Sequence, residues 1–211
     1  MNKQRLMFPR WLRFWHWANA VVFFTLLYTG FNLHFAALGA GNTSFRRSVV
    51  LHNAFGIALI VLYVFYIVAQ LVTGHIRQYK PTLRGVIAQT RWYLLGVFKG
   101  EHHPFESTLE SRFNPIQRLA YVFAVYVLFP AQAITGIALL YPDRAPVSVA
   151  GMGGIWPMAV GHSVLAYAFT AFLLVHLYLA LTIAEENTGV VRMLKGDRAP
   201  TDTPPAPEPH E

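Results

Sequence analysis

Residues 159–183 read AVGHSVLAYAFTAFLLVHLYLALTI, and this stretch decides the fold because its 25 residues include no Asp, Glu, Lys or Arg. A helix needs about 20 mostly apolar residues to cross a bilayer, so the stretch predicts a membrane-spanning helix. It contains two histidines, His162 and His176, 14 positions apart. At about 100° and 1.5 Å per residue, they share one helix face and stand about 21 Å apart along the axis. They are too far apart to share one metal ion, so they predict two sites stacked across the membrane.

Three other segments lack charge in the same way. Uncharged gaps cover residues 14–45, 48–76 and 119–142 as well as 145–184, and only 13% of all residues are charged. A soluble domain carries about 25% charged residues. The prediction is an all-α membrane protein, a four-transmembrane-helix bundle over residues 1–198 with spans near 12–34, 50–73, 116–141 and 159–183. Residues 199–211 are rich in Pro and acidic side chains and predict a disordered tail.

The basic residues divide unequally between the two ends of these spans. One end, with both termini and the 74–115 loop, carries fourteen of the 17 Lys and Arg residues, and the other carries Arg46, Arg47 and Arg144. Cytoplasmic loops of membrane proteins collect Lys and Arg, so both termini are predicted to be cytoplasmic. The net charge of +7 therefore indicates topology, and no nucleic-acid partner is expected.

Two segments outside the spans show patterns of their own. Residues 83–99 place apolar side chains at helical spacings beside Trp92 and Tyr93. They predict either an amphipathic helix on the cytoplasmic membrane face or a short helix docked on the bundle. Residues 141–158 are rich in Pro and Gly and predict an irregular outer loop. The chain has no cysteine, which excludes disulfides, cysteine-ligated iron–sulfur clusters and covalently attached c-type haem.

Depth in the membrane suggests partners for the two histidines of the last span. His162 lies near the outer face, level with His52 at the start of the second span. His176 lies nearer the cytoplasm, level with His16 in the first span. His34 and His75 compete on depth but are followed four residues later by the bulky Leu38 and Tyr79. The four selected histidines are followed instead by small residues that leave room for a flat ring, namely Ala20, Gly56, Ala166 and Ala180.

Paired histidines on facing helices are typical axial ligands of b-type haem. The pair His52 and His162 therefore predicts an outer haem iron, and the pair His16 and His176 an inner one. A zinc site is not expected, because zinc needs three or four ligands around one point and the depths of these histidines bring only two together. Histidines of a proton relay are the competing interpretation, but such relays normally include buried Asp or Glu, which these spans lack.

Two arginines close to the predicted outer site have two interpretations. Arg46 and Arg47 stand just before His52, on a side that is otherwise nearly free of positive charge. They are candidate partners for anionic haem propionates. The alternative is a solvated pair in a loop, which contributes little to stability.

Several short motifs lie along the spans, namely Arg13-Phe14-Trp15-His16-Trp17, Thr29-Gly30, Leu51-His52-Asn53, Phe113-Asn114-Pro115-Ile116-Gln117, Thr135-Gly136 and the two histidines of the last span. Together they resemble the cytochrome b subunits of formate dehydrogenase and thiosulfate reductase. The likeness covers residues 10 to about 185, and the loop segment Gly100-Glu101-His102-His103-Pro104-Phe105 resembles the thiosulfate-reductase type. Cytochrome b subunits of nickel–iron hydrogenases are a more distant similarity.

The resemblance implies a dihaem gamma-subunit that anchors a complex in the bacterial inner membrane and is not an enzyme alone. It would relay electrons between an outer iron–sulfur subunit, with its molybdopterin catalytic subunit, and a quinone, either menaquinone or ubiquinone. The resemblance implies the same four haem ligands and a quinone site at Asn114 and Gln117, near the inner haem. The alternative for Asn114 is a helix cap before Pro115. Higher oligomers are compatible with the resemblance.

Two other classes of function stay open on the sequence. One is a self-sufficient transmembrane b-type reductase for ferric iron or ascorbate, which needs no partner subunit. The other is a haem-free membrane anchor or small transporter. The chain has no recognisable nucleotide, molybdopterin or iron–sulfur motif, so the leading interpretation requires a partner that exchanges electrons with it.

Overall fold

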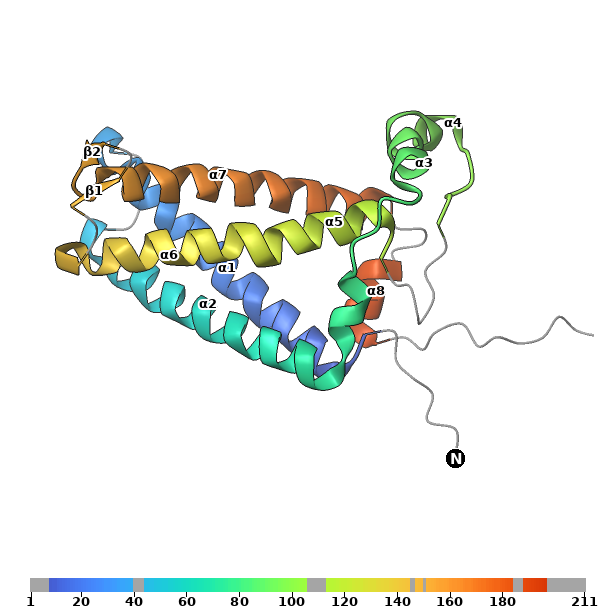
Figure 1. The fold of residues 1–211 in the computed structure, drawn as a ribbon, viewed down its shortest axis with the longest axis horizontal. Coiled ribbons are helices and arrows are strands. Elements are labelled where there is room, and N and C mark those ends of the chain that lie inside the picture. Colours follow the sequence, from blue (N-terminus) through green and yellow to red (C-terminus); the bar gives the residue numbers. More distant parts are fainter. Residues whose placement is uncertain are drawn as a thin grey trace, which may run out of the picture.

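The computed structural model describes residues 8–39, 44–105, 113–144, 147–149, 151–183 and 188–196. Long helices run side by side along the longest axis of the molecule (Figure 1). They are α1 (Arg10–His34), α2 (Phe45–Thr73), α5 (Pro115–Phe123) continued by α6 (Phe129–Leu140), and α7 (Trp156–Tyr178). Each uncharged stretch of the sequence has therefore folded into a long helix. The predicted tail, 199–211, lies outside the described residues.

Three of the described helices are long and apolar enough to cross a membrane. They run over Phe45–Thr73, Pro115–Leu140 and Trp156–Leu181. The helix α1 is not among them, although its 25 residues reach the length that a bilayer requires. Polar residues in its first half, such as Arg13, His16 and Asn19, lower its hydropathy. The fourth span therefore stays a prediction at this point.

Local signals set the ends of these helices. The Ser44 side chain accepts a hydrogen bond from the Arg47 amide at 3.4 Å, so α2 begins at Phe45 rather than near residue 50. Gly74 ends α2 in the left-handed conformation, with φ of 70°. A π-helical turn, Ala124–Leu128, joins α5 to α6. Pro130 follows it and has no backbone N–H, which disfavours a regular hydrogen-bond ladder there.

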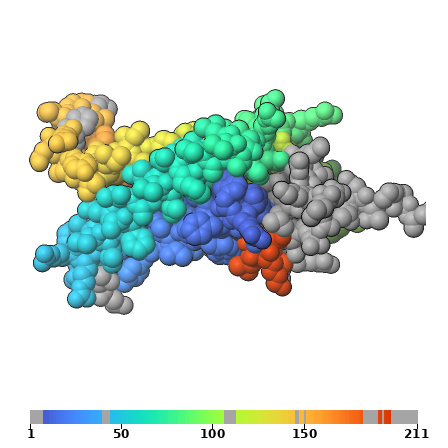
Figure 2. All heavy atoms as spheres, turned by 90° about the horizontal axis from the view of Figure 1, so that it is seen from below, coloured from blue at the N-terminus to red at the C-terminus, as the bar shows by residue number. Residues whose placement is uncertain are grey.

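The long helices associate in pairs. The helix α1 packs along α2, and α6 packs along α7. Contacts of α1 with α7 and of α2 with α6 join the two pairs into one bundle. Figure 2 shows α1 and α2 packed side by side on one face of the molecule.

The bundle buries polar side chains beside apolar ones and exposes large apolar side chains on its outside. The most buried side chains include Thr29, Asn32, Ser48 and Gln70, each no more than 4% exposed. Large apolar side chains face outward instead, among them Val21, Phe24, Phe31, Ile57, Val61, Leu71, Val164 and Leu174. A bilayer requires this arrangement, because lipid cannot satisfy polar groups and does not oppose exposure of apolar ones.

Short elements lie at the two ends of the bundle (Figure 1). The end where the outer loop was predicted carries the 3-10 turns Ala36–Leu38 and Pro142–Arg144 and the antiparallel pair β1 (Ser148–Val149) and β2 (Met152–Gly153). The loop is therefore less irregular than the prediction. The opposite end carries the 3-10 turn His75–Tyr79, α3 (Val86–Arg91), the π-helical turn Trp92–Gly96, α4 (Val97–Lys99), the π-helical end of α7 at Leu179–Ile183, and α8 (Thr188–Lys195).

The predicted helix at 83–99 corresponds to one helical segment over residues 86–99. It begins after Gly85, which has a φ of 83°. One side docks on the bundle, where Gln89 is only 1% exposed and Tyr93 contacts the start of α5. The other side presents Ile87, Leu94 and Phe98, which are between 66% and 86% exposed. The segment is therefore docked on the bundle by one side and presents apolar side chains on the other.

Candidate functional site

Two histidine pairs meet in the interior of the bundle, at its two ends. His52 on α2 faces His162 on α7, with 6.2 Å between the ring centres. His16 on α1 faces His176 on α7, with 6.3 Å between the ring centres. These are the pairs that depth along the chain predicts. Their role as metal ligands stays a prediction.

The separation within each pair suits one metal ion held between two imidazoles. A metal–nitrogen bond of about 2 Å on each side, plus about 1 Å from nitrogen to ring centre, places the ring centres about 6 Å apart. In the described part of the chain no three His, Asp or Glu side chains converge on a possible metal position. Each site therefore offers two ligands, which is the number of axial ligands that the protein supplies to a bis-histidine haem.

The outer pair is held by the same two residue types on both sides. Thr29 of α1 lies with its hydroxyl oxygen 2.9 Å from Nδ1 of His52. A Cβ atom at the neighbouring Gly30 would stand 3.3 Å from Cε1 of that ring. The glycine therefore lets α1 approach the imidazole of α2 closely.

The other half of the outer site repeats this contact. Thr135 of α6 has its hydroxyl oxygen 3.0 Å from Nδ1 of His162, and a Cβ atom at Gly136 would stand 3.1 Å from Cε1. Each Thr-Gly pair thus leaves the Nε2 atom of its histidine directed away from the threonine. In the sequence these Thr-Gly pairs are visible only as a likeness to other cytochrome b subunits, and their spacing does not place them against the histidines.

Unpaired polar atoms gather at the two sites. The amide nitrogen of Gln132 lies 3.1 Å from Nε2 of His162, while its oxygen has no partner among the described residues. Ser48, one helical turn before His52, is fully buried and its hydroxyl has no partner there either. The same is true of Nδ1 of His16. Buried polar atoms without partners are costly, so their presence at both pairs fits sites that bind a further group.

At the outer pair a small residue leaves space for such a group. A Cβ atom at Gly56, one turn after His52, would meet no atom within 4 Å. The residues present therefore fit two flat macrocycles, with His52 and His162 holding one and His16 and His176 the other. The signal for Gln132 in the sequence was only that it is a polar residue inside an apolar span, and Ser48 lies just before the predicted start of its span.

The inner pair has different surroundings. The ring of His176 stacks on Phe172, and the ring of His16 meets Trp17 edge to face. The short helix α8 covers this end of α1, where Arg13 donates to the Leu194 carbonyl at 3.1 Å and Trp17 to the Met193 carbonyl at 3.3 Å. Figure 2 shows α8 beside the start of α1.

The two histidines that competed on depth have other partners. The Nε2 atom of His34 lies 3.2 Å from the Tyr167 hydroxyl. The Nδ1 atom of His75 lies 2.9 Å from the Thr73 hydroxyl, and its ring meets Trp11 edge to face. Among the described residues neither of them faces another histidine, so the structure brings neither into a two-ligand site.

The two arginines predicted for propionates lie in the first turn of α2. Both Arg46 and Arg47 are exposed, at the same end of the bundle as His52. Among the described residues the one ion pair is that of Arg91 with Glu101, so both guanidinium groups are open to an anionic partner. Their role stays a prediction.

The residues predicted for quinone form a capping box at the start of α5. Asn114 accepts a hydrogen bond from the Gln117 amide at 2.9 Å, and the Gln117 side chain accepts one from the Asn114 amide at 3.1 Å. Asn114 is 2% exposed and its amide group donates to the Tyr93 hydroxyl at 2.8 Å. Burial raises the pKa of Tyr93, so this hydroxyl stays protonated at neutral pH. The capping alternative therefore holds, and a quinone role would be additional to it.

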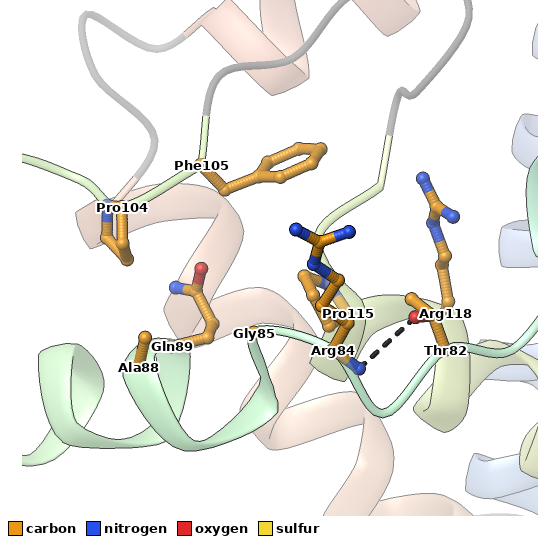
Figure 3. A pocket seen from close by; sticks show the side chains of 9 residues that line it. All are labelled: Thr82, Arg84, Gly85, Ala88, Gln89, Pro104, Phe105, Pro115 and Arg118. Atoms are coloured by element: carbon orange, nitrogen blue, oxygen red, sulfur yellow. Dashed lines mark hydrogen bonds between the residues drawn. The ribbon is translucent and has the colours of Figure 1, made fainter.

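A cavity of about 270 Å³ lies beside this capping box, away from both histidine pairs. Its lining includes Arg84, Gln89, Phe105, Pro115 and Arg118. Figure 3 shows the guanidinium groups of Arg84 and Arg118 extending in the same direction, with Gln89 on the far side of Gly85. Neither Asn114 nor Gln117 lines it, so this cavity is distinct from the predicted quinone site.

Comparison with known proteins agrees with this geometry. The family model described as "Prokaryotic cytochrome b561" matches residues 7–196. The chain is also similar to the "Putative cytochrome YdhU" of Escherichia coli (strain K12), with 34% identity over 185 residues, which cover 83% of this chain and 67% of the relative. The family match spans both histidine pairs and all of the long helices. The chain thus belongs to the prokaryotic cytochrome b561 family, and it is a membrane haem protein that binds b-type haem and transfers electrons.

Proposed function

We propose that this chain is a four-span cytochrome that holds two b-type haems, one at each histidine pair. The observation that carries the proposal is the presence of two His–His pairs, 6.2 and 6.3 Å between ring centres, with one member of each pair on α7. The two α7 histidines are 14 residues apart, about 21 Å along a helix. When bound, each haem supplies a one-electron carrier, while the protein sets its position, ligands and surroundings.

The helix α1 is the fourth span in this proposal. Three features support it: the 25-residue length, the packing along α2, and the outward direction of Val21, Phe24 and Phe31. Its polar interior residues Thr29 and Asn32 face the bundle rather than lipid. The helix therefore contributes His16 from within the membrane.

The proposed orientation places both termini in the cytoplasm of a bacterial cell. The excess of Lys and Arg at that end of the spans supports it. The segment 86–99 then lies at the cytoplasmic membrane face, with Ile87, Leu94 and Phe98 toward the lipid boundary. The pair His52 and His162 lies toward the outer face.

The cytochrome is proposed to relay electrons between an outer oxidoreductase module and the quinone pool. The motif likeness to formate dehydrogenase and thiosulfate reductase subunits supports an outer iron–sulfur partner with a molybdopterin catalytic subunit. Quinone is proposed to react at the cytoplasmic end, near the inner histidine pair, with Asn114 and Gln117 at the start of α5 as its partners. The Tyr93 hydroxyl, which accepts a hydrogen bond from Asn114, can donate beside them. Arg46 and Arg47 are proposed to bind the propionates of the outer haem.

Ligand substitution tests the two-site arrangement directly. His52→Ala and His162→Ala should each remove the outer haem and leave the inner one, and His16→Ala and His176→Ala should do the reverse. His34→Ala and His75→Ala serve as matched controls, because both rings have other partners. The measurement is the optical spectrum and haem content of each purified variant. Loss of a haem in a control, with retention in His52→Ala, would contradict the assignment.

A further inference from the structure

The outer histidines are fixed by threonine hydroxyls, and the inner ones are not. Thr29 contacts Nδ1 of His52 at 2.9 Å, and Thr135 contacts Nδ1 of His162 at 3.0 Å. In the described part of the chain no hydrogen bond reaches the ring of His176, and Nδ1 of His16 is buried without a partner. The two predicted haem sites therefore differ in the hydrogen-bond partners of their histidine ligands.

The direction of these hydrogen bonds follows from what each threonine does with its own proton. The Thr29 hydroxyl donates to the Thr25 carbonyl at 2.8 Å, and the Thr135 hydroxyl to the Ala131 carbonyl at 3.0 Å. A hydroxyl has one proton, so its oxygen must accept from the imidazole. Nδ1 of each outer histidine therefore carries the hydrogen, and Nε2 carries a lone pair.

A separate contact supports the same tautomer at His162. The Gln132 amide nitrogen lies 3.1 Å from Nε2 of His162, and an amide nitrogen can only donate. Nε2 is therefore the acceptor here, which is the state that a metal ligand needs. Thr29 and Thr135 thus present both outer imidazoles with Nε2 ready to bind.

We propose that Thr29 and Thr135 are positioning residues for the outer haem and that their hydrogen bonds lower its midpoint potential. This rests on the proposed dihaem function. An Nδ1–H that donates to an acceptor makes the imidazole a stronger electron donor, and a stronger donor stabilises ferric over ferrous iron. Because the inner ligands lack such partners among the described residues, the two hydrogen bonds would give a haem held by His52 and His162 a lower midpoint potential than the same ligands would without them.

The test compares Thr29→Ala and Thr135→Ala with Thr29→Ser and Thr135→Ser in the purified full-length protein. Thr25→Ala and Thr170→Ala are matched controls, because the hydroxyls of these threonines also donate to carbonyls of their own helices, at Val21 and Ala166. The readouts are haem content, the midpoint potential of each haem and the ferric low-spin EPR signal. The same variants are also made in the His16→Ala protein, which should keep only the outer haem. The signals measured there can be assigned to the outer haem.

The Ala variants should raise the midpoint potential of the outer haem and shift its EPR signal, or lose that haem outright, while the inner haem is unchanged. The Ser variants should behave as the unaltered protein does. Full retention of the outer haem with an unchanged potential and EPR signal in both Ala variants would overturn the inference, as would equal shifts in the controls. Failure of the dihaem proposal would look different, because the unaltered protein itself would then lack two haems.

Discussion

Gly30 of α1 lies so close to His52 of α2 that a Cβ atom at the glycine would stand 3.3 Å from Cε1 of the imidazole. Gly136 of α6 stands in the same relation to His162, at 3.1 Å. Both distances are shorter than ordinary van der Waals contact, so an added methyl group must displace the ring. These two glycines therefore fix how near the neighbouring helices come to the outer pair.

Substitution of these glycines should weaken the outer site. Gly136→Ala is expected to displace the His162 ring by a few tenths of an ångström and to lower outer haem occupancy, and overpacking of this kind costs about 1–3 kcal/mol. Gly30→Ala should act in the same direction more mildly. The haem content and thermal stability of the purified variants measure this. Gly153→Ala in β2 is the control, because its Cβ would meet no atom within 4 Å. An equal loss of haem in Gly153→Ala would contradict the role of close approach.

Arg46→Gln and Arg47→Gln should lower the midpoint potential of the outer haem. A nearby positive charge disfavours the more positive ferric state, and removal of that charge relieves the effect. The shift should shrink at high salt, because both side chains are exposed. Arg144→Gln is the control at the same end of the bundle, where that guanidinium lies over the Tyr141 ring. A redox titration in which all three variants shift equally would argue against propionate binding by Arg46 and Arg47.

Different substitutions at Asn114 distinguish a role in quinone binding from its role as a helix cap. Asn114→Ser keeps a capping hydroxyl but removes the amide that donates to Tyr93. The cap should therefore persist while quinone turnover falls, and the loss of stability should be limited to that one hydrogen bond. Asn114→Leu should also lose about 1 kcal/mol of stability with its cap. Gln117→Leu should slow turnover with both haems in place. Steady-state quinone assays normalised to haem content measure this. Unchanged turnover in Asn114→Ser and Gln117→Leu would place the site elsewhere.

The helix α8 is held against the start of α1, next to His16 in the chain, by hydrogen bonds from Arg13 and Trp17. Trp17→Phe removes the donor to the Met193 carbonyl, so α8 should loosen and expose the inner haem to the cytoplasmic side. Reduction of that haem by a soluble, membrane-impermeant reductant should become faster, with no change at the outer haem. Trp11→Phe is the matched control, because the ring of Trp11 packs at this end against Tyr66 and His75 rather than against α8. Stopped-flow rates that do not change in Trp17→Phe would show that α8 does not gate access.

The positions of the long helices could be predicted because a bilayer leaves long uncharged stretches in the sequence. The early start of α2 could not, since it depends on the single cap at Ser44. The helix α8 was missed because it is short and is held by side chains of α1, far away in the sequence. The strand pair at Ser148–Gly153 was missed because Gly and Pro there indicate turns without specifying their pairing.

The histidine pairs could be predicted from depth, because rise per residue along a helix converts sequence position into height in the membrane. The contacts of Thr29 and Thr135 with the outer imidazoles could not. They depend on the rotation of α1 and α6 about their axes, and α6 follows a π-helical turn that shifts this rotation. The same holds for Gln132, whose contact with His162 depends on which face of α6 meets α7.

The haem content of the purified chain decides whether each histidine pair holds a haem. A pyridine haemochrome assay, referred to the amount of polypeptide, should give two b-type haems per chain, because two separate histidine pairs each match one iron between two imidazoles. A value of one haem per chain, or none, would contradict the two-site account.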